Sequence, residues 1–242
     1  MEVIKKLDKI YLDFFAENNI DTNTGLVLNT NKRFATKIAI GDNYFQASKK
    51  TLFVSLDIGK DEYFNENRFQ SYNERRENAL YYSVDGRNPH MAGVYGVALY
   101  FLKDVFGWGE TWTKLENSNQ FFREALLSNK SIVPTNVLSN IAMINFFNYV
   151  TVGRTQRTGG NDRFLLNETS ELKLLVNIIN EIKPDTIIVQ SKTLKGFFRD
   201  KIKPFIKGDT DIFVSYHPSV FGRGIKYRNP KLHIADLLKN KI

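Results

Sequence analysis

The sequence predicts an α/β protein, a three-layer α/β/α sandwich built on a short, mainly parallel sheet of four strands. Short apolar runs typical of buried strands alternate along the chain with segments whose apolar residues recur at helical spacing. This alternation favours a parallel sheet covered on both faces, because each crossover helix packs back onto the sheet. No internal repeat, linker or low-complexity tract interrupts the 242 residues. A single domain over residues 1–242 is therefore expected.

The first half of the chain is expected to open with a helical extension at about residues 1–30. Apolar residues recur at helical spacing from Ile4 to Phe15, and the Asn- and Thr-rich residues after them are typical of a loop. A buried strand and a second amphipathic helix, ended by Gly107, follow. The elements expected after the opening are an extended piece at 37–40, a strand at 51–56, a polar loop at 60–90 and a helix at 94–105.

The second half of the chain continues the alternation of helices and strands. Its one long polar stretch, residues 151–163, carries several arginines and indicates a basic loop. The elements expected in this half are helices at 121–127, 172–179, 194–205 and 234–238, and strands at 139–145, 186–190 and 211–216.

The composition restricts the chemistry that this chain can perform. It has no cysteine, which excludes disulfides, thiol catalysis and any cysteine-ligated zinc or iron–sulfur cluster. The formal net charge of +8 favours a polyanionic partner such as DNA, because basic side chains that neutralise phosphates release counterions. No apolar run approaches the roughly 18 residues of a membrane span, and the first residues do not form a signal peptide. A cytoplasmic, monomeric protein is expected.

Polar residues follow two of the predicted strands directly. Asp57 comes after the apolar run at 51–56, and His217 comes after the run that begins at Asp211. In an open parallel sheet, groups at the carboxyl ends of strands line the ligand crevice. Asp57 and His217 are therefore candidates for one shared catalytic site, and the alternative is that both are loop residues without a common site.

The order of several motifs resembles that of the uracil-DNA glycosylase superfamily, over residues 34–224. The His-Pro-Ser motif stands at His217–Ser219, and the other segments fall before it in the family's order. These segments are residues 53–62 for the first motif, 86–96 for the Gly-Arg-Pro-Phe-Val-Gly-x-Ala-Gly stretch of the iron–sulfur branch, 143–148 for the strand with the family's Asn, and 182–189 for the Lys-Pro-x-x-Ile-Val strand.

The chain also departs from the pattern of this superfamily. Ser55 and Ile58 stand where the first motif has its leading Gly and its Pro, and the cluster cysteines are absent. The resemblance therefore implies a relative that holds no metal and needs no cofactor. The missing Gly and Pro favour a non-catalytic relative as the alternative to an enzyme.

The resemblance implies roles for particular residues in breaking an N-glycosidic bond. Asp57 would orient the attacking water, although a strand-end cap is the alternative role, and His217 would contact the base carbonyl oxygen. Asn145 would read the base with its amide, with Asn148 as the competing choice. The remaining expected contacts are His90 or Met91 stacked on the base, and Ser219, Arg223, Arg154 and Arg157 on DNA phosphates, with Arg163 in the same basic loop.

The function expected from these residues is that of a DNA glycosylase that removes uracil or a related damaged base by hydrolysis. Two alternatives belong to other classes. A non-catalytic relative would bind nucleic acid or a protein partner through the same basic face. A nucleoside or nucleotide hydrolase would use the same scaffold on free small molecules, since one fold hosts many functions.

Overall fold

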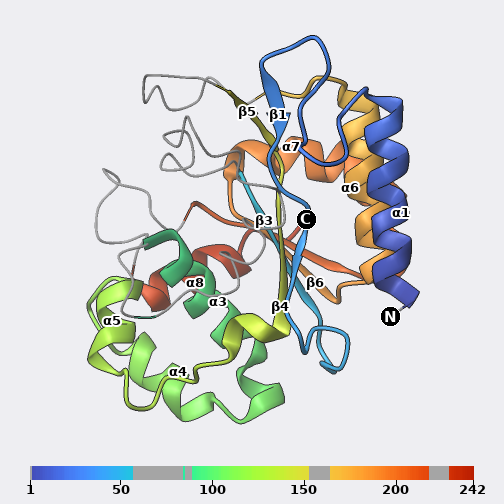
Figure 1. Ribbon diagram of the computed structural model, residues 1–242. Helices are drawn as coiled ribbons and strands as arrows, with labels where there is room; N and C mark the ends of the chain where they lie inside the picture. The colour runs from blue at the N-terminus through green and yellow to red at the C-terminus, as the bar shows by residue number, and fades with distance from the viewer. Residues whose placement is uncertain (1, 57–83, 85–88, 153–163, 218–228) are drawn as a thin grey trace.

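The computed structural model describes residues 2–56, 84, 89–152, 164–217 and 229–242 (Figure 1). The elements in chain order are α1 (Glu2–Glu17), β1 (Lys32–Phe34), β2 (Ala39–Ile40), β3 (Thr51–Ser55), α3 (Pro89–Phe106), α4 (Gly109–Glu116), α5 (Phe122–Ser128), the short turn η2 (Val137–Asn140), β4 (Ile141–Asn145), β5 (Tyr149–Thr151), α6 (Glu168–Ile182), β6 (Thr186–Val189), the turn η3 (Lys192–Leu194), α7 (Lys195–Phe197), the π-helical η4 (Phe198–Ile202), the turn η5 (Lys203–Phe205), β7 (Asp211–Val214) and α8 (Pro230–Leu238).

The main sheet has the strand order β2-β4-β3-β6-β7. Strands β4, β3, β6 and β7 run parallel, and only β2 is antiparallel to its neighbour β4. The prediction of an α/β protein with a mainly parallel sheet is confirmed. The sheet has five strands instead of four because the extended piece predicted at 37–40 pairs with the edge of β4 through the two residues of β2.

Helices cover both faces of this sheet (Figure 1). Because successive side chains of a strand point to opposite faces, each inner strand contributes to two apolar clusters. Leu52 and Val54 of β3 pack with α1, α6 and η4, whereas Phe53 between them packs with α3, α4, α5 and α8. All three side chains are fully buried, and burial of such a side chain contributes about 1.5–3 kcal/mol. The middle residues of these parallel strands are continuously apolar because helices cover both faces of the sheet.

The N-terminal helix belongs to the main core. Four of its apolar residues are buried, and the helix lies along α6 (Figure 1). The hydroxyl of Tyr11 accepts a hydrogen bond of 2.7 Å from the backbone N–H of Ile38, which ties α1 to the segment before β2. The predicted helical extension is thus packed on the sheet layer, as the spacing from Ile4 to Phe15 indicates.

Other parts of the chain differ from the sequence-based expectations. Helix α4 and the short antiparallel ladder between β1 and β5 were not predicted. The single helix expected over 194–205 is broken into α7, η4 and η5, and Phe205 is 63% exposed instead of completing an apolar face. Pro204 contributes to this break, since a proline lacks the N–H that a continuing helix needs.

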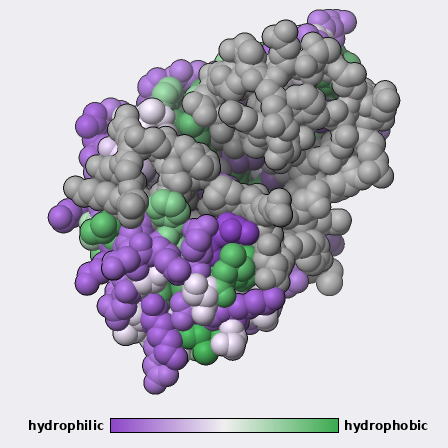
Figure 2. Space-filling model, turned by 90° about the vertical axis from the view of Figure 1, so that its left-hand side faces the viewer, coloured by the Kyte–Doolittle hydropathy of each residue, from purple (hydrophilic) through white to green (hydrophobic). Residues whose placement is uncertain are grey.

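Figure 2 shows the face of the molecule that lies on the left in Figure 1. Its described residues are mainly hydrophilic, with apolar residues interspersed among them. Within the described ranges, no helix has the length and apolar character required to cross a membrane.

Candidate active site at the carboxyl edge of the sheet

Four polar residues stand side by side where the parallel strands end. The residues are, in spatial order, Asn145 of β4, Ser55 of β3, Gln190 after β6 and Ser215 after β7. Each lies two positions after a strand residue that packs against α3, so the pleat of the sheet places all four on the α3 face. The ladder continues to the row, because the Gln190 N–H donates to the Val54 carbonyl at 2.9 Å. The sheet thus carries a polar row, Asn145–Ser55–Gln190–Ser215, along one edge.

The polar row crosses the topological switch point of the sheet. Strand β3 connects through α3, α4 and α5 to β4 on one side, whereas β6 lies on the other side of β3 and connects through α7 to β7. Neighbouring strands whose connections leave in opposite directions open a crevice outside their carboxyl ends, and ligands of open α/β sheets bind there. Ser55 and Gln190 are the two row residues at this position.

Ser55 joins the row to the start of α3. Its hydroxyl donates a hydrogen bond of 3.0 Å to Oε1 of Gln190, and its Oγ lies 3.4 Å from Nε2 of His90. Since the single hydroxyl proton is used toward Gln190, Oγ accepts from His90, and the imidazole carries its proton on Nε2. His90 is the second residue of α3, which begins at Pro89, a residue favoured at a helix start because its missing N–H costs no hydrogen bond there.

Both ends of this hydrogen-bonded chain stop at a buried polar atom. Nδ1 of His90 and Nε2 of Gln190 have no hydrogen-bond partner among the described residues. Such an atom normally costs about 1–3 kcal/mol, so most buried polar groups are paired. The chain His90–Ser55–Gln190 therefore presents one unpaired acceptor and one unpaired donor.

His90 and His217 form a stacked pair of imidazoles. Their ring centroids are 4.4 Å apart, and the ring planes differ by 20°. Burial of His90, together with repulsion from the nearby His217 ring, lowers its pKa to about 3. His90 is consequently neutral at physiological pH, and the stack brings the residue from the start of α3 onto the predicted catalytic histidine.

The two residues before His217 are held by neighbouring elements. The backbone N–H of Ser215 donates to the Val189 carbonyl at 2.8 Å, which extends the pairing of β7 with β6. The ammonium of Lys192 lies 3.9 Å from the centre of the Tyr216 ring and pairs with Asp236 of α8 at 2.9 Å. These contacts fix Ser215 and Tyr216, the two residues between the end of β7 and His217.

The two alternatives for the base-reading amide separate clearly. Asn145 is partly exposed and stands in the polar row beside Ser55. Asn148 is buried, and its side-chain Nδ2 donates to the carbonyl of Thr36 at 2.7 Å, while its backbone carbonyl accepts from the N–H of Ala35. Asn148 thus holds the segment that leads from β1 to β2, and only Asn145 lies at the candidate site.

The two alternatives for the stacking residue also separate. Met91 is 7% exposed and belongs to the apolar cluster between α3 and the sheet. His90, one position earlier on α3, lies at the sheet edge against Ser55 and His217. The structure brings His90, Asn145 and His217 to the same edge and places Met91 in the core.

Several predicted site residues lie outside the described part of the chain. They are Asp57, Arg154, Arg157, Ser219 and Arg223. In the sequence, Asp57 follows Leu56, the last described residue after β3, and Ser219 comes two positions after His217.

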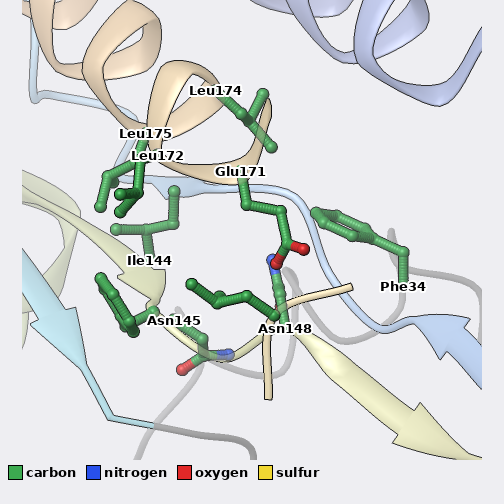
Figure 3. A pocket seen from close by; sticks show the side chains of 10 residues that line it. Phe34, Ile144, Asn145, Asn148, Glu171, Leu172, Leu174 and Leu175 are labelled. Carbon is green, nitrogen blue, oxygen red and sulfur yellow. The ribbon is translucent and has the colours of Figure 1, made fainter. Parts of the chain in front are cut away.

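A small cavity of about 20 Å³ lies behind the row, between β4 and α6. Figure 3 shows the Glu171 side chain reaching from α6 toward Asn148 and Phe34. Burial raises the pKa of the Glu171 carboxyl to about 7. Hydrogen bonds from backbone N–H groups, among them that of Asn167 at 2.8 Å, lower this pKa but do not cancel the effect of burial. The cavity has room for about one water molecule and borders Asn145.

Three residues of the row were not singled out by the sequence as site residues: Ser55, Gln190 and Ser215. Ser55 was noticed only as a departure from a motif, and the other two as ordinary residues of a strand. A usable signal exists, because each is the first polar residue after a run of at least three apolar residues. That signal becomes specific only when strand order and register are known.

The described residues contain no group of three or more His, Cys, Asp or Glu side chains that could hold a metal ion. Comparison of the chain with protein-family models, with curated proteins and with solved structures found no match.

Proposed function

We propose that this protein is a DNA glycosylase that hydrolyses the N-glycosidic bond of uracil or a related damaged base. One observation carries the proposal: His90 stacks on His217, and Asn145, from a third distant segment, lies at the same carboxyl edge of the parallel sheet, beside Ser55. The motif order described above assigns the base-binding and catalytic roles to residues of these same segments. The fold that this proposal implies is the three-layer sandwich of the uracil-DNA glycosylase superfamily.

The proposed reaction separates an oxocarbenium-like sugar from a base anion. In this proposal Asp57 orients the water and stabilises the positive charge on the sugar, and His217 donates a hydrogen bond to the base oxygen that gains negative charge. Asn145 contacts the base through its amide. The excess of basic residues supplies contacts to DNA phosphates.

A single-turnover excision assay tests this proposal. Labelled single- and double-stranded oligonucleotides that carry one uracil are incubated with excess protein, and abasic product is measured. We expect wild-type protein to form product, and Asp57→Asn and His217→Ala to slow it by about a hundredfold or more, because each removes one charge-stabilising group. His233→Ala is the matched control, since this buried histidine of α8 packs on Phe122 away from the row. No product from wild-type protein would refute uracil excision and favour a non-catalytic DNA-binding protein or a different damaged base.

A second candidate function is DNA binding without catalysis. The stacked rings of His90 and His217, 4.4 Å apart, favour it, because each imidazole covers a face that a flipped base would otherwise stack on. In this case DNA binding would show the steep salt dependence of phosphate contacts, but excess protein would release no base.

A further inference from the structure

We propose that Gln190 and His90, joined through Ser55, determine which base this protein accepts by reading a base edge that presents a ring N–H beside a carbonyl oxygen. This inference rests on the proposed function only in taking a base of DNA as the ligand. It assigns specificity to residues other than Asn145, the amide that the motif order singles out.

The first step of the argument is the polarity of the hydrogen-bonded chain. The Ser55 hydroxyl donates to Oε1 of Gln190 at 3.0 Å, so the free end of that amide is its NH₂ group. Ser55 then accepts from Nε2–H of His90, which leaves a lone pair on Nδ1. The two free atoms are thus one donor and one acceptor, held by a shared hydroxyl.

The second step is the ligand that satisfies both atoms. A carbonyl oxygen accepts from the Gln190 amide, and a ring N–H donates to the His90 lone pair. Uracil and other bases with a lactam edge carry these two groups next to each other, whereas cytosine presents the reverse pair, a ring nitrogen acceptor beside an amino donor. A site built to pair buried groups rejects a ligand that leaves them unpaired.

The third step is access in the presence of the stacked rings. His217 covers a face of the His90 ring, but the Nδ1 lone pair lies in the plane of that ring. Edge-on pairing with a base is therefore compatible with the stack. The low pKa of His90 supports the argument, because a neutral imidazole keeps the lone pair available.

Binding of non-cleavable oligonucleotides tests the inference. The probes are fluorescent single strands of adenine nucleotides with one central 2′-fluorinated nucleoside, whose base is uracil, N3-methyluracil or cytosine. The fluorine resists cleavage, and the adenine background makes the central base the only lactam edge. Fluorescence anisotropy should show uracil bound at least about tenfold more tightly than either other base, which corresponds to about 1.4 kcal/mol.

Two variants connect the selectivity to the named residues. Gln190→Met removes the donor at similar volume, and His90→Phe removes the acceptor and keeps a ring. In each variant the preference for uracil should fall from the tenfold or more expected of wild type to less than about threefold. His233→Phe should keep the full preference, and thermal melting checks that each variant is folded. The N3-methyluracil comparison uses wild-type protein alone, so it stays informative if a variant does not fold.

The possible results separate this inference from the proposed function. Equal binding of the three probes, tighter binding of the cytosine probe, or binding of none would overturn the inference, whatever the excision assay shows. Selective binding of uracil without excision would support the inference and refute the glycosylase. Excision of uracil together with equal binding of the three probes would support the glycosylase and refute the inference about Gln190 and His90.

Discussion

The hydroxyl of Ser55 donates a hydrogen bond of 3.0 Å to the side chain of Gln190, although the two residues are 135 positions apart in the sequence. They meet because β3 and β6 are neighbours in the sheet, with Val54 opposite Val189. The bond is buried and connects to His90 through the same hydroxyl. It is thus both a structural contact between two strands and the centre of the candidate specificity site.

Removal of the Ser55 hydroxyl should destabilise the protein measurably. Ser55→Ala leaves Oε1 of Gln190 and Nε2 of His90 without their partner in a buried position, and a buried unpaired group costs about 1–3 kcal/mol. Urea denaturation measures the change in the free energy of unfolding. The chain offers a matched control in Ser128→Ala, which removes an exposed hydroxyl bonded to Gln120 and should cost under about 0.5 kcal/mol. Equal effects of the two variants would contradict the prediction.

His90 should make the protein sensitive to acid. Its pKa is lowered from 6.5 to about 3, so between these values the unfolded chain binds a proton that the folded chain does not. The contribution of His90 to the stability therefore falls as pH decreases below 6.5, by about 1.4 kcal/mol for each pH unit. His90→Phe should abolish this loss. Urea midpoints at several pH values measure it, and a difference between variant and wild type that stays constant from pH 7 to 5 would refute the expectation.

Glu171 should act in the opposite direction. Burial raises its pKa from 4.5 to about 7, so between these values the folded protein holds a proton that the unfolded chain has lost. Stability due to this group decreases as pH rises from about 4.5 to 7, and the loss is complete above 7. Glu171→Gln keeps an acceptor for the Asn167 N–H and should stabilise the protein at pH 8 by about 1–3 kcal/mol. At pH 4 the gain should vanish.

These two groups also predict the shape of the pH profile of the wild-type protein. Between about pH 4.5 and 6.5, the contributions of His90 and Glu171 to the stability change in opposite directions. Wild-type stability should therefore depend less on pH in this range than that of either single variant. A wild-type profile steeper than both variant profiles would show that another group dominates.

Gly96 of α3 should not tolerate replacement by alanine. A Cβ at this position would meet Cδ1 of Phe122 at 2.2 Å, where α3 and α5 cross. Because Phe122 is buried, Gly96→Ala forces the helices apart and should cost about 1–3 kcal/mol. Gly196→Ala in α7 is the control, since no atom lies within 4 Å of its added Cβ and alanine favours a helix. Thermal melting should show a lower melting temperature for Gly96→Ala than for wild type, and an equal or higher one for Gly196→Ala.

Local patterns in the sequence predicted much of the fold. The apolar runs at 51–56 and 186–190 became β3 and β6, and the helical spacing from Ile4 to Phe15 became α1. The two strands were predictable because burial on both faces makes a short run continuously apolar, and the helix because burial of one face imposes a period of 3.6 residues. Helix α4 was missed because only Thr111, Trp112 and Leu115 are buried along it, too few for a clear period.

The sequence by itself determined the alternation of buried strands and helices, the absence of cysteine chemistry, and the place of His217 after a strand. The tertiary structure decided which strand ends became neighbours, and hence that Ser55 meets Gln190 and that His90, not Met91, lies against His217. The physical reason is the range of the interactions. Hydrophobic periodicity is a property of one segment, whereas strand order and register depend on contacts between segments more than a hundred residues apart.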